Sequence, residues 1–320
     1  MRPGGAAPPL TAAGAPPAGR AAGYALVIVS YLVMGSIGAL VNLSRAPESM
    51  LLVLRMGIAG LVLGVLFVRR GSIRELCQPG VPLRLAAMVF FDAGGLLCFF
   101  TALRLTNVAI SMFLLFMSPV WVAILAPRLL RQRTDPWVYP ALAVAFLGLV
   151  VILIPDITGG SGNVPATGVA LALVAGFLYT GFLLTMGSLT KRVHSATLVT
   201  CESLLDALVL LPLALWQVVG SGYRLSERDL LVSAILGVAC TAFAYTIWTE
   251  GVRRVPVAHV SILGYLEPLS APLYALLLLG ERPTAWTLLG GVLIVGAGVM
   301  VVTRGGSQVG EVEAAAEPPG

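Results

Sequence analysis

The sequence predicts an all-α integral membrane protein with ten transmembrane helices, arranged as two inverted five-helix repeats. Three observations lead to this fold class: an apolar composition, ten long apolar stretches and an internal repeat. Of the 320 residues, 58% are hydrophobic and 11% are charged, and the mean hydropathy is +0.94. Soluble domains carry about a quarter charged residues. The composition therefore indicates a polytopic membrane protein.

Ten stretches are long enough to cross a bilayer core of roughly 30 Å, which takes about 20 mostly apolar residues. Backbone polar groups find no water in lipid, so long spans without a two-residue period are expected to be helices. The predicted spans are residues 23–42, 49–68, 83–103, 107–127, 137–155, 166–186, 197–219, 230–250, 256–279 and 285–303.

The spans define the expected organisation of the chain. Residues 1–22 and 304–320 are rich in Pro, Gly and Ala and predict disordered tails. Residues 23–155 are expected to form the first five-helix repeat and residues 166–303 the second. The glycine-rich segment 156–165 is expected to be the external linker between them.

Positive charges predict the orientation. If the N-terminus is cytoplasmic, fourteen Arg and Lys residues fall in cytoplasmic segments and five outside, and only Arg55 lies within a span. This bias predicts a multi-pass protein of the inner (plasma) membrane with both termini in the cytoplasm. The net charge of +5 then reflects topology and attraction to lipid headgroups, with no basic stripe that would indicate nucleic acid.

The two halves of the chain are related by an internal repeat. Residues 104–133 and 253–282 align without gaps at an offset of 149 residues. Five spans per half place the second half in the membrane with the opposite orientation. Inverted repeats are the usual construction of secondary transporters, which bind a solute near the midplane between their halves. The repeat therefore predicts a carrier that works by alternating access.

Charged residues inside the spans are candidates for a solute site, because a charge at the bilayer centre costs about 2.5 to 3.5 kcal/mol on insertion scales. Asp92 and Glu267 fall near the middle of their helices, and Glu202 and Asp206 share one face of the seventh span. Arg55 either anchors an anionic solute group, reaches the headgroups or pairs with a carboxylate. Carboxylates that meet in a dry cavity would suit proton coupling. The sequence leaves open whether they meet.

Aromatic and proline residues complete the candidate site. Pro119 and Pro268 occupy equivalent points of the two repeats, where each removes a helical hydrogen bond and predicts a hinge, with a packing kink as the alternative. Aromatic residues inside the spans could form the walls for an amphiphilic solute or could serve packing alone. They are Tyr31, Trp121, Tyr179, Tyr245, Trp248 and Tyr265.

Other function classes find little support. The cysteines Cys77, Cys98, Cys201 and Cys240 lack metal-binding spacing. Neither His-Glu-x-x-His, Gly-x-Ser-x-Gly nor a phosphate-binding Gly-x-x-x-x-Gly-Lys occurs, so no catalytic residue, metal or cofactor is expected. A lipid translocator or a channel is the main alternative to a carrier of small solutes, and an intramembrane enzyme is less favoured. The oligomeric state stays open.

The chain resembles the drug/metabolite transporter superfamily, with two EamA-type domains, over residues 23–303. The resemblance rests on the ten spans, the tandem halves, Leu-Glu-Pro at 266–268, Gly-Glu-Arg at 280–282, the glycine-rich last span and Arg55. The first half departs from the motif, because Ser118 stands in place of the glutamate before Pro119. The resemblance implies an inner-membrane permease for small metabolites such as amino acids, with a cavity lined mainly by spans 1, 3, 4, 6, 8 and 9.

A cysteine at position 160 tests the predicted topology in a chain whose four native cysteines are replaced by serine. It is expected to react with a membrane-impermeant maleimide added to intact cells, because the linker is predicted to be external. A cysteine at position 72, in a predicted cytoplasmic loop, serves as the control and is expected to react only after permeabilisation. Labelling of position 160 from the cytoplasmic side alone would refute this topology.

Overall fold

The computed structural model describes residues 17–67, 74–106, 108–130, 136–159, 165–280 and 284–304. All regular secondary structure of these segments is helical, which confirms the predicted fold class. Three groups of predicted features lie outside the described residues: most of both tails, the centre of the linker, and Glu281 and Arg282 of the Gly-Glu-Arg motif.

The helices of the first half are α1 (Pro17–Met34), α2 (Ile37–Asn42), α3 (Glu48–Phe67), α5 (Val81–Leu105), α6 (Val108–Leu115), α7 (Ser118–Leu129) and α8 (Val138–Gly159). Those of the second half are α9 (Ala166–Leu189), α10 (Ser195–Ser221), α11 (Glu227–Ile235), the π-helix η1 (Leu236–Phe243), α12 (Ala244–Arg254), α13 (Val257–Leu263), α14 (Leu266–Leu279) and α15 (Ala285–Arg304). Residues 17–22, predicted as part of a tail, are helical, because proline suits the first position of a helix and alanine favours helix.

Nine helical stretches among the described residues are long and apolar enough to cross a membrane. The predicted span 107–127 is not one of them, because it is divided into α6 and α7 at Phe116 and Met117. The equivalent span 256–279 is divided into α13 and α14 at Gly264 and Tyr265. Each break is followed by a new helix whose first turn contains a proline, Pro119 in α7 and Pro268 in α14. The N–H that proline lacks would have no helical partner in a first turn, so its absence costs no helical hydrogen bond.

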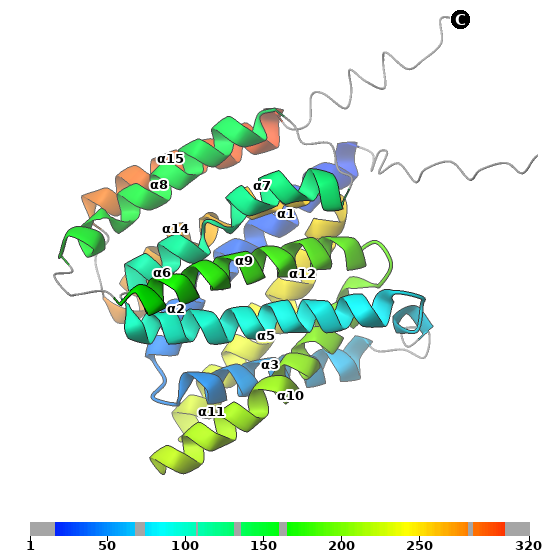
Figure 1. Cartoon of the computed structure of the whole chain (residues 1–320), viewed down its shortest axis with the longest axis vertical. Coiled ribbons are helices and arrows are strands. Elements are labelled where there is room, and N and C mark those ends of the chain that lie inside the picture. The colour runs from blue at the N-terminus through cyan, green and yellow to red at the C-terminus, as the bar shows by residue number, and fades with distance from the viewer. Residues whose placement is uncertain are drawn as a thin grey trace, which may run out of the picture.

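Helix packing shows how the two halves fit together (Figure 1). The first helix of each half packs on the third span of the other: α1 contacts α12, and α5 contacts α9. The equivalent helices α3 and α10 pack on each other, as do α8 and α15. A two-fold relation between inverted repeats requires these reciprocal pairings. The offset of 149 residues also carries α5 onto residues 230–254, which end where α12 ends.

The two broken spans meet at the centre of this arrangement. The Tyr265 hydroxyl donates a hydrogen bond of 2.8 Å to the Phe116 carbonyl, and the two rings lie 5.8 Å apart. Phe116 and Tyr265 are themselves separated by 149 residues. The Val120 N–H bonds the Met117 carbonyl, so the Phe116 carbonyl has no donor from its own helix and accepts from its repeat partner instead.

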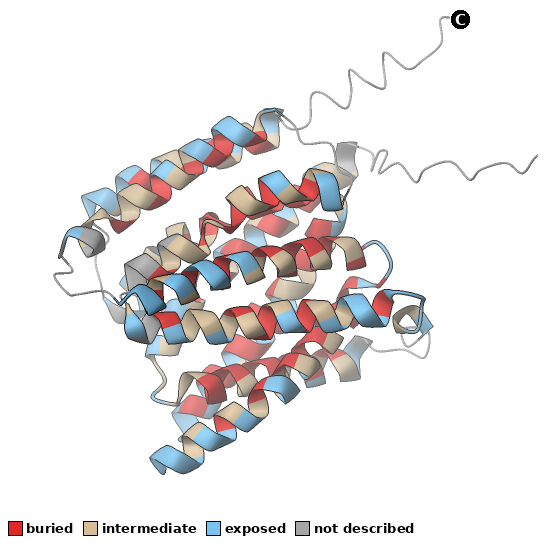
Figure 2. Cartoon of the chain, in the orientation of Figure 1, coloured by how far each residue is buried: buried red, intermediate tan, exposed pale blue. Residues whose placement is uncertain are grey.

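Both described ends of the chain lie on one side of the bundle, because α1 begins and α15 ends there (Figure 1). We call this the terminal side and the other the opposite side. The outward faces of α8 and α15 carry exposed residues (Figure 2). Large apolar side chains such as Trp216, Leu277 and Val292 are also exposed. In a multi-pass membrane protein these surfaces contact lipid tails, so their exposure does not place apolar surface in water.

The crossing of α8 and α15 generates a stability prediction. A Cβ on Gly290 would collide with the Gly148 carbonyl oxygen and lie 2.6 Å from Ile152 Cγ1, whereas a Cβ on Gly296 would meet no atom within 4 Å. Gly290→Ala is expected to lower the free energy of unfolding by about 1 to 3 kcal/mol through overpacking. Gly296→Ala, in the same helix, is the matched control. Thermal unfolding in detergent measures both variants, and equal melting temperatures would contradict the close crossing.

Candidate functional site

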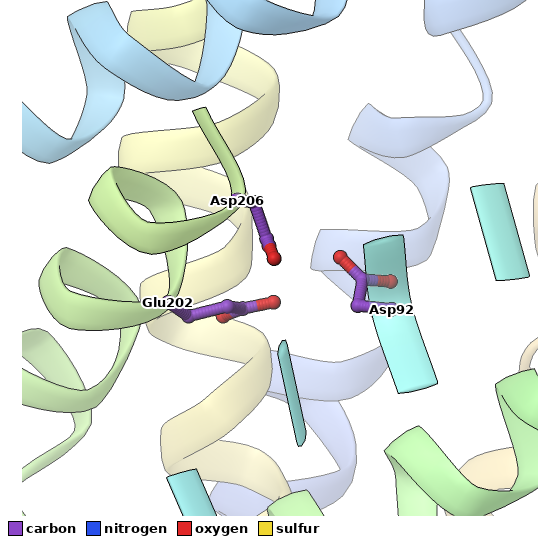
Figure 3. A group of neighbouring side chains, drawn as sticks. All are labelled: Asp92, Glu202 and Asp206. Carbon is purple, nitrogen blue, oxygen red and sulfur yellow. The ribbon is translucent and has the colours of Figure 1, made fainter. Parts of the chain in front are cut away.

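Three of the predicted carboxylates form one cluster in the interior of the bundle (Figure 3). Asp92 projects from α5, while Glu202 and Asp206 project from successive turns of α10 toward it. One oxygen from each residue lies within 4.8 Å of one from each of the others. The three side chains thus come from both halves of the chain, and we call them the acidic triad.

The acidic triad is buried and lacks donors. Asp92 is 7% exposed, Glu202 1% and Asp206 0%, so solvent cannot compensate the charges. Of the six carboxyl oxygens, five are buried and accept no hydrogen bond from the described residues: Oδ2 of Asp92, both oxygens of Glu202 and both of Asp206. A buried carboxylate without donors or a counter-charge is strongly unfavourable. The acidic triad is therefore stabilised either by protons on its carboxyl groups or by a cationic group between the three side chains.

Arg55 from α3 lies in the same interior, on a second wall that α3 forms with η1. Its Nε donates a hydrogen bond of 2.6 Å to Thr241 Oγ1 in η1, and Thr241 in turn bonds the Leu236 carbonyl at 3.1 Å. Short π-helical segments frequently mark functional sites. Gly237 allows η1 to approach α3, because a Cβ there would lie 2.9 Å from the Arg55 carbonyl oxygen. No ion pair within 4.0 Å joins Arg55 to a described carboxylate.

The repeat relation connects the two walls. Thr241 is the position reached from Asp92 by the offset of 149 residues, and α3 is the repeat equivalent of α10. The contact between α10 and α5 that holds the acidic triad is therefore the counterpart of the contact between α3 and η1 that holds Arg55. One of these two related contacts carries negative side chains and the other carries a positive one. The fold is symmetric here, but the charges are not.

Glu267 does not join the acidic triad. It lies in the first turn of α14, is partly exposed, and interacts with Arg55 through long-range Coulombic forces. Coulombic interactions also connect Arg55 with Asp92 and Glu202. Arg55 is therefore the common cationic neighbour of carboxylates from three different helices.

Four of the six predicted aromatic residues meet in one cluster, which also includes Phe182. Trp248 contacts Tyr31 edge-on at 6.3 Å, stacks on Phe182 at 6.2 Å and lies 5.8 Å from Tyr245. Tyr179 stacks on Phe182 at 5.9 Å. Tyr245 interacts electrostatically with Asp92 and Glu202, so it lies between the aromatic cluster and the acidic triad.

The other two predicted aromatic residues lie elsewhere. Trp121 contacts Phe177, whose side chain is 53% exposed on the outer surface of α9. Tyr265 is fully buried and bonds Phe116 at the meeting point of the two broken spans. Trp121 thus belongs to the lipid-facing side and Tyr265 to the packing of the repeats.

A pocket of about 120 Å³ opens near the acidic triad on the opposite side of the bundle. Its lining includes Leu52, Leu96 and Leu210, which lie about one helical turn from Arg55, Asp92 and Asp206 respectively. A larger groove of about 360 Å³ between α14 and α15 is apolar and lies away from these charges. The smaller pocket is therefore the one placed to lead a solute toward the charged residues.

The acidic triad offers few ligands for a metal ion. Ca²⁺ takes six to eight oxygen ligands and Mg²⁺ six, and among the described residues no further His, Cys, Asp or Glu joins the three carboxyl groups. An ammonium group or protons need fewer partners. The donor set thus suits an organic cation or protons better than a dedicated metal site.

Sequence reasoning missed Thr241 and Phe182. Thr241 could have been found by extending the offset of 149 residues from Asp92, because the repeat places it at the equivalent point of η1. Phe182 carried no signal, since one phenylalanine in an apolar helix resembles any other.

Comparisons with known proteins place the chain in a family. The EamA-like transporter family model matches residues 21–154 and 166–303. An uncharacterized transporter of Archaeoglobus fulgidus is 28% identical over 286 residues, which cover 88% of this chain and 96% of the relative. The threonine/homoserine exporter RhtA of Escherichia coli is 27% identical over 264 residues, covering 81% of this chain and 84% of RhtA.

A solved crystal structure shares the fold, with a TM-score of 0.74 and 18% sequence identity over 87% of this chain and 96% of that one. The matches confirm the resemblance to the drug/metabolite transporter superfamily. Together with the apolar helices they identify a multi-pass membrane protein related to transporters. The chain belongs to the EamA-like transporter family.

Proposed function

We propose that the protein is a secondary carrier for small metabolites that bear both an ammonium and a carboxylate group, such as amino acids. The observation that supports this substrate class is the opposite charge of two repeat-related helix contacts, the one that holds the acidic triad and the one that holds Arg55. A zwitterion complements both walls at once, whereas a purely anionic or purely cationic solute complements only one.

The residues suggest how such a solute binds. The ammonium group lies among the carboxyl groups of the acidic triad, and the Arg55 guanidinium donates to the solute carboxylate in the forked geometry that arginine favours. Apolar parts of the solute contact Tyr245 and the rest of the aromatic cluster. The similarity to RhtA, which is named as a threonine/homoserine exporter, favours the same substrate class.

The direction of insertion is also part of the proposal. The charge bias of the loops favours an inner-membrane protein with both termini in the cytoplasm. The structure is compatible with this orientation, since α1 begins and α15 ends on the same side. We propose that the terminal side faces the cytoplasm and that the halves move against each other at the breaks before Pro119 and Pro268.

We further propose that transport is an exchange of solute for protons. The acidic triad carries three carboxyl groups, and Arg55 supplies one positive charge from the facing wall. When no ammonium group is bound, protons on the carboxyl groups limit the buried negative charge. An incoming ammonium group displaces protons to the solvent, so solute and protons occupy the acidic triad in turn.

Arg55→Gln tests the carboxylate site by counterflow of radiolabelled amino acids in proteoliposomes. The variant is expected to raise the KM for amino acids at least about tenfold, because it removes a charged hydrogen-bond donor. For the corresponding amines, which lack a carboxylate, the KM is expected to change little. Arg253→Gln, which removes an exposed arginine paired with Glu250, is the control. An equal rise in the KM for amines and for amino acids would show that Arg55 serves folding alone.

Glu202→Gln and Asp206→Asn test proton exchange. In vesicles loaded with solute, an acidic external buffer is expected to accelerate efflux through the wild-type protein, because protons enter as solute leaves. Each variant is expected to keep part of the counterflow and to reduce this acceleration, since its amide cannot carry a proton while the other two carboxyl groups still can. Glu250→Gln, at a helix end in contact with Arg253 and Arg254, is the control. Acceleration equal to the wild type in both triad variants would refute proton exchange at the acidic triad.

A further inference from the structure

On the opposite side of the bundle, one buried carboxylate joins the two halves. Asp229, near the start of α11, is 1% exposed. Its Oδ1 accepts from Ser44 Oγ at 2.7 Å and the Arg45 N–H at 3.0 Å, both in the loop between α2 and α3. Its Oδ2 accepts from the Tyr223 hydroxyl, the Ser226 N–H and the Ser226 hydroxyl at 2.7, 2.9 and 2.7 Å. We call these five residues the Asp229 latch.

A second carboxylate joins the halves on the terminal side. Glu75, just before α5, accepts a hydrogen bond of 2.9 Å on Oε2 from the N–H of His194, which precedes α10. Next to it, Arg192 Nη1 donates to the Pro79 carbonyl at 3.2 Å. We call these four residues the Glu75 latch.

The donor loops of the two latches are repeat equivalents, while the carboxylates stand at different positions, because the same offset carries Glu75 to Arg224 and not to Asp229. His194 is the position reached from Arg45 by the same offset of 149 residues that relates Phe116 to Tyr265. In each latch, a backbone N–H between the first and second spans of one half donates to a carboxylate at the start of the third span of the other half. The loops that form them lie at opposite ends of the bundle (Figure 1).

Each latch holds together the helices that carry one wall of the candidate site. The Asp229 latch joins the beginning of α3 to the beginning of α11, which leads into η1, and these elements carry Arg55 and Thr241. The Glu75 latch joins the beginnings of α5 and α10, which carry the acidic triad. Separation at a latch would therefore open a path from that side toward the wall behind it.

We infer that the two latches are the gates of the carrier and that they open in alternation. This inference rests on the proposed alternating-access transport. The Asp229 latch is the stronger gate, because its carboxylate is buried and accepts five hydrogen bonds. The Glu75 carboxylate is partly exposed and accepts one hydrogen bond from the described residues. The hydrogen bond to Asp229 also raises the pKa of the Tyr223 phenol, in keeping with its role as a donor in the latch. Without solute, the protein opens preferentially on the terminal side.

Native Cys240 reports on the Asp229 latch. It lies in η1, is 1% exposed, and its sulfur is 3.4 Å from Ser36 Oγ. In a chain whose other three cysteines are serine, Asp229→Asn is expected to accelerate reaction of Cys240 with an impermeant maleimide about tenfold, and only from the opposite side, because an amide loses accepting capacity. The measurement is made on oriented proteoliposomes without solute. The rate of Cys240 labelling therefore tests the gate even if the protein transports none of the proposed solutes.

Further variants make the test decisive. Ser44→Ala removes a single donor to Asp229 and decides the question if Asp229→Asn does not fold. Ser221→Ala is the matched control, because the Ser221 hydroxyl bonds only carbonyls within α10. In this variant Cys240 is expected to react as slowly as in the parent. At position 91, the repeat equivalent of 240, a cysteine is expected to label faster from the terminal side in Glu75→Gln. Unchanged labelling of Cys240 in folded Asp229→Asn and Ser44→Ala would overturn the gating role.

Discussion

The structure depends on one constraint: in lipid, a backbone carbonyl released from its helix must find a donor inside the protein. Two spans are broken at equivalent points, and the Phe116 carbonyl freed by the first break accepts from Tyr265, which lies at the second. The carbonyl at the first break is thus satisfied only when the other repeat is in place, whereas the Gly264 and Tyr265 carbonyls at the second break accept from their own span. The contact holds the repeats in register at the centre.

Around this contact, the inverted repeats create two equivalent helix contacts that the side chains make chemically different. α10 with α5 places three carboxyl groups together, whereas α3 with η1 places a guanidinium against a threonine. In the carrier that we propose, backbone symmetry lets the two halves exchange conformations, and the difference in charge suits a zwitterion. The π-helical turn of η1 and Gly237 bring α3 and the second half close enough for the Arg55 contact.

The same symmetry reaches both surfaces of the bundle. Loop residues one repeat apart, Arg45 and His194, donate to carboxylates of the other half at opposite ends. Their surroundings differ, because Asp229 is buried among donors and Glu75 is not. In the gating that we infer, this difference in local chemistry makes one end of the bundle harder to open than the other.

The sequence by itself determined the fold class and the repeat, since hydrophobic length and an offset of 149 residues are one-dimensional signals that lipid makes strict. It also identified Arg55, Asp92, Glu202 and Asp206, because a charge in an apolar span is costly wherever it lies. Only the tertiary structure decided that Glu267 stands apart from the acidic triad, that Trp121 faces outward and that Asp229 holds two loops. Those outcomes depend on helix rotation and on contacts between distant segments, and the apolar pattern of a chain that is hydrophobic on most faces does not specify either of them.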